Sequence, residues 1–304
     1  MSELTFIEWL RRRTPNDPRI LLGPGDDSAA LRFTPGATCL VTTDMLLEGS
    51  CFILKEAGAR RVGRKAMAVN LSDIAAMAGK PVAAVVSVGL PREGGQALAE
   101  ELYLGMREMA DAFDTAIIGG DTNSWNGPLV ISVTLLGEAT EKGAVCRSGA
   151  KRGDSLLVTG PLGGSIRGRH LEFTPRIKEA LALHQLVDLH AMIDVSDGLA
   201  LDLHRLCQES RCGAVVRAKD VPISDDAKIM SHDRLPLDHA LEDGEDFELL
   251  FAVGPEDGDR LVKTQPIEGI TLTHVGECIS QGLWLEEQGQ CKPLEPRGYV
   301  HEMR

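Results

Sequence analysis

Hydrophobic runs of strand length alternate along this chain with apolar residues at helical spacing, which restricts the folds it can adopt. The valine-rich run 82–90 has strand character, and in Leu129–Glu138 apolar and polar residues alternate. Between the short β-like run Cys39–Thr43 and the run 82–90, Met67, Leu71 and Ile74 recur at the spacing of one helix face. The pattern predicts an α/β (α+β) fold in which amphipathic helices lie on sheets.

A polar, glycine-containing stretch, Glu141–Gly153, interrupts this alternation, which then begins again. Beyond it we expect a strand at 155–159 and a helix at 176–189. With 304 residues the chain is long enough for two domains. The sequence therefore predicts an N-terminal domain at 1–145 and a C-terminal domain at 146–304.

The charge balance excludes several classes of partner. The chain has 32 Lys and Arg against 45 Asp and Glu, a net charge of −13, and no basic stripe that would bind nucleic acid or an anionic membrane. Its longest nearly apolar stretch, 81–90, has about half the length of a bilayer span. The N-terminus lacks the features of a secretory signal, and the seven cysteines form no Cys-x-x-Cys pair. We therefore expect a reduced, cytoplasmic protein.

Six clusters of carboxylates stand beside Gly, Ser or Thr at turns or at the ends of elements. They are Gly25–Asp27, Thr42–Asp44, Asn70–Asp73, Gly119–Thr122, Asp194–Gly198 and Asp243–Asp246. Any one of them is most simply read as a helix cap or a turn. Carboxylate and hydroxyl oxygens are also the ligands that Mg²⁺ takes together with substrate phosphates. Six such clusters in one acidic chain favour a site for phosphate-bound Mg²⁺.

Other motifs point away from common nucleotide and metal sites. Gly23–Ser28 has the glycine spacing of a dinucleotide loop, but it leads into another strand and carries two carboxylates, so we expect a turn. Gly58–Lys65 lacks the ending of a P-loop, and no histidine pair has zinc-enzyme spacing. Ser196 precedes a predicted helix, where capping and a functional role both remain open. Arg147 is a cation that could neutralise a transferring phosphate.

The chain resembles bacterial thiamine-monophosphate kinases. The segments GPGDDSAAL, TTDMLLEG, NLSDIAAMAGKP, IIGGDT, DVSDGLALDL and DGEDFELLF occur in that family's order and rough spacing, from about Phe6 to Tyr299. The family lies in the aminoimidazole-ribonucleotide synthetase superfamily. The resemblance implies a two-domain fold, with an N-terminal sheet domain that binds ATP and Mg²⁺ and forms a homodimer. The C-terminal α/β domain would complete the ATP and substrate site.

The implied activity is ATP-dependent phosphorylation of thiamine monophosphate to thiamine diphosphate by direct in-line transfer. Several Mg²⁺ ions would assist it, with ATP as co-substrate. The resemblance implies metal ligation by Asp26, Thr42, Thr43, Asp44, Asp73, Asp121, Asp194 and Asp197. It implies ATP contacts from Tyr103, Gly120, Asp121, Arg147 and Ser196, and substrate contacts from Cys51, Glu245 and Tyr299. The catalytic set would be Asp44, Asp121 and Arg147.

One position departs from the family pattern, and alternative functions follow from the shared superfamily. The family has histidine where this chain has Cys51, which carries no imidazolium to meet a phosphate.

A ribonucleotide cyclo-ligase or a maturation factor would use ATP on a related fold, although maturation factors end in a reactive cysteine and the tail 301–304 has none. A non-catalytic nucleotide sensor is the third alternative, and the six acidic clusters argue against it.

Overall fold

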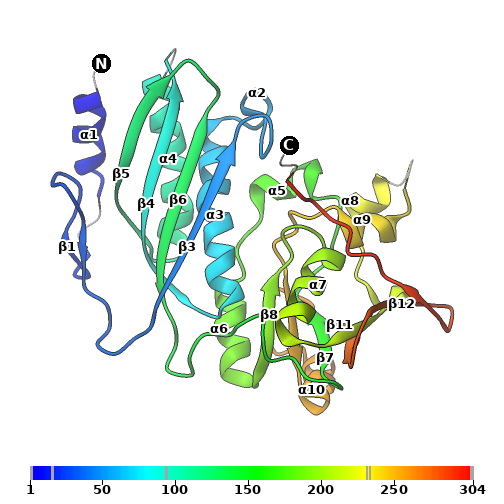
Figure 1. Ribbon diagram of the computed structural model, residues 1–304. Coiled ribbons are helices and arrows are strands. Elements are labelled where there is room, and N and C mark those ends of the chain that lie inside the picture. The colour runs from blue at the N-terminus through cyan, green and yellow to red at the C-terminus, as the bar shows by residue number, and fades with distance from the viewer. Residues whose placement is uncertain (1–2, 15–16, 93–94, 231, 233, 302–304) are drawn as a thin grey trace. The chain divides into compact units, whose positions relative to one another are not determined.

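A computed structural model describes residues 3–14, 17–92, 95–230, 232 and 234–301 (Figure 1). The last residues of the tail considered above, 302–304, lie outside the described residues. Contacts between Cα atoms divide the chain into two compact units. Unit 1 comprises 1–74 and 79–143, and unit 2 comprises 75–78 and 144–304. The roles expected of the two predicted domains stay predictions.

Unit 1 is built on a four-stranded sheet in the order β3-β6-β4-β5 within the described residues. Its strands are β3 (Cys39–Leu47), β4 (Lys80–Pro91), β5 (Ala116–Trp125) and β6 (Val130–Glu138). A small hairpin, β1 (Ile20–Leu22) with β2 (Ala30–Leu31), precedes them. The helices are α1 (Glu3–Arg11), α2 (Leu54–Ala57), α3 (Ala59–Ala76) and α4 (Gly95–Ala112). Strands β4 and β5 are parallel and joined through α4, whereas the other neighbours in the sheet are antiparallel.

The two faces of this sheet differ in burial, and the apolar residues of the alternating segment Leu129–Glu138 lie on the buried face. Ile131, Val133 and Leu135 of β6 are fully buried, and α3 and α4 lie together along one face of the sheet (Figure 1). On the opposite face, Val41 and Met45 of β3 are 64% and 61% exposed. The sheet therefore presents apolar side chains to solvent on the face away from its helices.

Helices α3 and α4 approach closely because each has a glycine at the contact. A Cβ on Gly63 would lie 2.0 Å from the carbonyl oxygen of Leu102, and one on Gly105 would lie 1.9 Å from that of Arg60. The segment that shares its glycine spacing with a P-loop is thus mostly helical, and Gly63 serves helix packing. This contact fixes α3 and α4 relative to each other within unit 1.

Unit 2 is built on a mostly antiparallel seven-stranded sheet in the order β13-β12-β9-β11-β7-β10-β8 within the described residues. Its strands are β7 (Ser155–Val158), β8 (Leu189–Asp194), β9 (Gly213–Arg217), β10 (Leu249–Val253), β11 (Thr273–Ile279), β12 (Leu283–Glu287) and β13 (Gln290–Pro293). Its helices are α5 (Arg169–Glu172), α6 (Ile177–Leu186), α7 (Leu199–Ser210), α8 (Asp225–Ile229), α9 (Pro236–Glu242) and α10 (Pro255–Thr264), with 3₁₀ turns η1 (Ser165–Arg167) and η2 (Ala218–Asp220).

The core of unit 2 packs α7 against the sheet. Leu156, Ile193, Leu203 and Leu250 belong to one buried apolar cluster. The strand predicted at 155–159 and the helix predicted at 176–189 correspond to β7 and α6. None of the described helices combines the length and apolar character that a membrane span requires.

Candidate functional site

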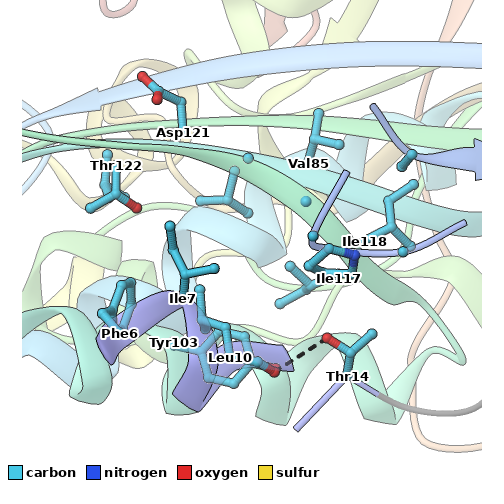
Figure 2. A pocket seen from close by; sticks show the side chains of 18 of the residues that line it. Phe6, Ile7, Leu10, Thr14, Val85, Tyr103, Ile117, Ile118, Asp121 and Thr122 are labelled. Atoms are coloured by element: carbon cyan, nitrogen blue, oxygen red, sulfur yellow. Dashed lines mark hydrogen bonds between the residues drawn. The ribbon is translucent and has the colours of Figure 1, made fainter. Parts of the chain in front are cut away.

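A cavity of about 540 Å³ lies beside β5 in unit 1 (Figure 2). Its walls are mostly apolar and include Ile7 and Leu10 from α1, Ile118 from β5 and Tyr103 from α4. The ring of Tyr103 meets that of Trp9 edge-on, with centroids 5.3 Å apart, and its hydroxyl accepts a hydrogen bond from Arg107 Nη1 at 3.2 Å. The cavity has the size and apolar lining of a small-molecule site.

Four positions expected to serve ATP or metal line this same cavity. They are Tyr103, Gly120, Asp121 and Asp26, the last in the turn between β1 and β2. The segment Gly23–Ser28 is therefore the predicted turn and not a dinucleotide loop. Gly120 has φ +154°, and a Cβ there would lie 1.8 Å from the carbonyl oxygen of Val86. The close approach of β4 and β5 at this point thus requires glycine.

Asp121 and Thr122 leave β5 in opposite directions (Figure 2). Thr122 lies on the side of Ile7 and Phe6, whereas the carboxylate of Asp121 lies on the other side of the strand. This is the alternation expected of consecutive strand residues. Asp121 is therefore at the rim of the cavity and on the sheet face that carries Met45, with which it shares a row across the sheet.

A second group of predicted metal ligands gathers at the β3 edge of the sheet. Thr42 Oγ1 donates a hydrogen bond to the carboxylate of Asp73 in α3. Asp44 is two residues along β3, so its side chain lies on the same face as that of Thr42. Thr43 points to the opposite face, where its hydroxyl bonds the Val133 carbonyl oxygen at 3.1 Å.

The strand register separates Asp44 from Asp121. Asp44 pairs with Val133, Val133 with Val86, and Val86 with Gly120, so Asp121 belongs to the adjacent row, whose side chains point the other way. Because β3 and β5 are the two edges of the sheet, three strand spacings of about 4.8 Å, roughly 14 Å, separate them. Among the described residues, no three His, Cys, Asp or Glu side chains form a group able to hold a metal ion.

Cys51 lies in a turn that its own side chain helps to fix. The Leu47 amide donates to Cys51 Sγ at 3.5 Å, and the Cys51 amide donates to the Leu47 carbonyl oxygen at 2.9 Å. Lys65 of α3, which is 1% exposed, donates from Nζ to the Cys51 carbonyl oxygen at 2.8 Å. The thiol therefore lies against the end of β3, and the buried ammonium group of Lys65 stabilises the turn through its hydrogen bond.

In unit 2, the loop between β8 and α7 holds three more predicted residues. Asp194 ends β8 and is 3% exposed, and Ser196 and Asp197 are half-buried. The amides of Ser196, Asp197 and Gly198 all donate to Asp202 Oδ2, at 3.0, 2.9 and 3.1 Å. Asp202 rather than Ser196 thus satisfies these amides, and they are not available to a phosphate.

Asp202 was not predicted from the sequence, because its position inside an amphipathic helix gives no local signal. Burial raises the pKa of its carboxyl to about 7, while the Asp197 amide opposes the rise. Arg205 Nη1 lies 2.5 Å from Asp197 Oδ2 and 2.7 Å from Asp202 Oδ1. The Ser196–Gly198 loop is therefore supported by a buried carboxyl and a shared guanidinium.

The predicted substrate residues of unit 2 attach to the same loop. The Glu245 amide donates to the Ser196 carbonyl oxygen at 2.7 Å, and the Tyr299 amide donates to that of Asp197 at 2.9 Å. Glu245 is half-buried, and Tyr299 is 47% exposed. The structure therefore brings Ser196, Asp197, Glu245 and Tyr299 together.

Arg147 is exposed and attached to the other end of α7. Its carbonyl oxygen accepts a hydrogen bond from Ser210 Oγ at 2.8 Å, and that hydroxyl accepts one from the Ala150 amide at 3.1 Å. The Met192 amide also donates to the Cys146 carbonyl oxygen at 2.9 Å. The segment that carries Arg147 is thus held against unit 2 by its backbone.

A buried carboxyl in the last acidic cluster predicts a pH dependence of stability. Burial raises the pKa of Asp246 from its ordinary 3.8 to about 7, and Arg169 and Ser165 oppose the rise. The folded chain therefore binds this proton more tightly than the unfolded chain. The stabilisation is complete below about pH 4 and is lost as the pH rises through 7, about 4 kcal/mol in total.

We expect Asp246→Asn to weaken this dependence, because an amide does not titrate. Thermal unfolding of both proteins from pH 5 to pH 8.5 measures it: the Tm of the wild type should fall more steeply with rising pH than that of the variant. Parallel Tm profiles would show that Asp246 titrates outside this range.

Comparisons with known proteins identify the family and the fold. Residues 25–139 match the N-terminal domain, and residues 135–283 the C-terminal domain, of AIR synthase related protein. Thiamine-monophosphate kinase of Rhodopirellula baltica is 42% identical over 311 residues, which are 98% of this chain and 97% of the relative.

Two solved structures extend the likeness to the fold. Thiamine-monophosphate kinase from Stenotrophomonas maltophilia K279a has a TM-score of 0.82 at 33% identity and covers 95% of this chain and 98% of its own. AaThiL complexed with AMPPCP and TMP has a TM-score of 0.77 at 28% identity. The match covers 99% of this chain and 97% of AaThiL. These matches confirm the predicted two-domain superfamily fold. The chain belongs to the thiamine-monophosphate kinase family.

Proposed function

We propose that this protein transfers the γ-phosphoryl group of ATP to thiamine monophosphate, giving ADP and thiamine diphosphate. The observation that carries the proposal is the full-length likeness to thiamine-monophosphate kinases, at 42% identity over 98% of the chain. The cavity beside β5 supports it, because Tyr103 and Gly120, two expected ATP contacts, line one apolar pocket. A relative with this fold is solved with AMPPCP and TMP.

The donor atoms at the β3 edge fit Mg²⁺. The hydroxyl of Thr42 and the carboxylate of Asp73 are in hydrogen-bond contact, and both are hard oxygen ligands. Asp44 adds a carboxylate on the same face, while Asp26 and Asp121 offer carboxylates at the β5 edge. Asp194 and Asp197 would serve in unit 2. Bound Mg²⁺ would neutralise phosphate charge, which an acidic chain cannot do with its carboxylates alone.

The chain's own residues then need to position two anions. The attacking phosphate oxygen is already ionised at neutral pH, so no strong general base is required. Tyr103 and Ser196 would hold the nucleotide, and exposed Arg147 would bring a guanidinium to the phosphates. Direct in-line transfer follows from orienting the two substrates rather than from an enzyme nucleophile.

The acceptor would be held by Glu245 and Tyr299, whose amides donate to carbonyl oxygens of the Ser196–Gly198 loop. Cys51 would act differently from the family histidine, since its sulfur accepts the Leu47 amide and its carbonyl oxygen accepts Lys65 Nζ. We propose that this turn keeps its shape through Lys65 and contacts the acceptor without a cationic side chain. A cytoplasmic location stays a prediction.

We also propose a homodimer formed through the sheets of unit 1. Val41, Met45 and Leu47 of β3 are 64%, 61% and 41% exposed and lie on the face away from the helices. Asp44 and Asp121 stand at opposite edges and on opposite faces of one sheet, so one chain does not bring them to a common ion. A second copy placed against this face and these edges would supply the missing carboxylate.

A product assay tests the activity. Purified protein with ATP, Mg²⁺ and thiamine monophosphate is expected to form thiamine diphosphate and ADP in equal amounts, measured by chromatography. Chelation of Mg²⁺ should abolish the reaction. Free thiamine and aminoimidazole ribonucleotide precursors are the comparison substrates, and turnover of these alone would favour the ribonucleotide cyclo-ligase alternative. ATP binding without any substrate-dependent ADP release would favour a nucleotide sensor.

A further inference from the structure

The backbone of the segment Gly244–Phe247 is strained. Glu245 has φ +54° and Phe247 has φ +50°, both in the left-handed region, and Gly244 has φ +74°. For residues with a Cβ this conformation is unfavourable, because the Cβ approaches the following carbonyl oxygen. Such strain persists only where the surroundings hold it. Contacts made by the residues next to Glu245 therefore have to stabilise this backbone conformation.

Glu248 is the first of these contacts. Its side chain is 4% exposed and accepts two parallel hydrogen bonds from Arg176, from Nε at 2.8 Å and from Nη2 at 2.7 Å. Thr159 Oγ1 donates a third bond at 2.6 Å. A buried carboxylate with a two-bond guanidinium partner has one well-defined position. Glu248 thus anchors the downstream end of the strained segment.

Asp246 is the second contact. Its side chain is 1% exposed, and its oxygens accept the Gly163 amide at 2.9 and 2.8 Å, Ser165 Oγ at 2.5 Å and Arg169 Nη2 at 3.2 Å. The Phe247 ring stacks on Phe173 with centroids 4.0 Å apart. Asp246 and Phe247 are therefore fixed in the interior, whereas the Glu245 side chain between Gly244 and Asp246 remains partly exposed.

We propose that Glu248 and Asp246, held by Arg176 and Arg169, are positioning residues that set Glu245 for the thiamine phosphate acceptor. The proposal rests on the function proposed above, in which Glu245 contacts the acceptor. The side chains of Asp246 and Glu248 are buried in the interior, at 1% and 4% exposure. They act by keeping Glu245 in a backbone conformation that it would otherwise leave.

The neighbouring Ser196–Gly198 loop, which would contact the nucleotide, has side-chain supports of its own. Asp202 accepts hydrogen bonds from the amides of all three of its residues, and Arg205 forms an ion pair with Asp197. Loss of the Arg176–Glu248 geometry should therefore weaken acceptor binding more than nucleotide binding. This difference separates positioning from a general loss of structure.

The test uses Arg176→Lys in the full chain. Lysine keeps the positive charge and loses the two parallel hydrogen bonds to Glu248. We expect the KM for thiamine monophosphate to rise about tenfold and the KM for ATP to change less than twofold. Calorimetric titration with thiamine monophosphate in the absence of ATP should show the same loss of affinity.

Arg167→Lys is the matched control, because Arg167 makes an exposed ion pair with Asp226 in the same unit. It should leave both KM values unchanged. If Arg176→Lys does not fold, Ser165→Ala takes its place. This change removes the hydrogen bond from Ser165 Oγ to Asp246 and leaves the ion pairs Arg176–Glu248 and Arg169–Asp246 in place. A rise of about threefold in the KM for thiamine monophosphate is expected from it.

An unchanged KM for thiamine monophosphate in the folded variant, or equal rises for both substrates, overturns the proposal. The wild type is assayed in parallel. If the wild type forms no thiamine diphosphate, the proposed function itself fails. If the wild type is active and the variant has the same KM values, only the positioning proposal fails.

Discussion

Asp44→Asn and Asp121→Asn should each abolish turnover while the protein stays folded. Each change keeps the side-chain size and removes the negative charge that would hold Mg²⁺. Charge stabilisation by a bound metal contributes several kcal/mol, so we expect a loss of more than about a thousandfold in kcat/KM. Product formation at saturating Mg²⁺ measures it, with Tm as the check on folding. Near-normal activity in either variant would contradict the proposed metal ligands.

The same two variants test how the site is shared between chains. Within one chain, Asp44 and Asp121 lie at opposite edges of the sheet and point to opposite faces. If one site takes Asp44 from one chain and Asp121 from the other, mixed dimers of the two variants contain one intact site. After subunit exchange in an equal mixture, about a quarter of wild-type activity should return. A mixture as inactive as its components would show that both residues act within one chain.

This separation is also where prediction from the sequence reached its limit. Local patterns identified the strands, and the motifs identified Asp44 and Asp121 as candidates. Which face each residue occupies depends on register, and β4 shifts register against β5 between Ala84 and Val85 and against β6 between Pro81 and Ala83. A shift of one residue moves a side chain to the other face. No local pattern shows such shifts.

The residues that hold the candidate site residues in place could not be predicted from the sequence for a related reason. Arg176 and Glu248 are 72 positions apart in the chain, and Thr159 and Glu248 are 89 apart. Thr159 meets Glu248 only when β7 and β10 lie side by side, and Arg176 reaches Glu248 from the start of α6. Asp202 is close to Ser196 in sequence, but it lies within an apolar helix pattern. The sequence therefore favoured Ser196, and not Asp202, as the residue that caps the start of the helix. Motifs thus indicated which residues contact ligands, and the fold was needed to find which residues hold them.

Gly105→Ala should strongly destabilise unit 1, because a Cβ there would lie 1.9 Å from the Arg60 carbonyl oxygen. Real Cβ atoms do not approach this closely, so α3 and α4 would have to move apart. Overpacking of this kind costs about 1–3 kcal/mol and occasionally more. We expect a value at the upper end, since the obstacle is backbone, and a fall in Tm of about 10 °C.

Gly95→Ala is the matched control in the same helix, since among the described residues its Cβ would meet only Leu90 Cβ, at 3.9 Å. Alanine there should leave Tm unchanged or raise it slightly. The comparison also bears on function, because α4 carries Tyr103 at the cavity and α3 carries Asp73 beside Thr42. A separation of the two helices should therefore raise the KM for ATP in whatever fraction of Gly105→Ala stays folded. Equal Tm values for the two variants would show that α3 and α4 do not cross at Gly105.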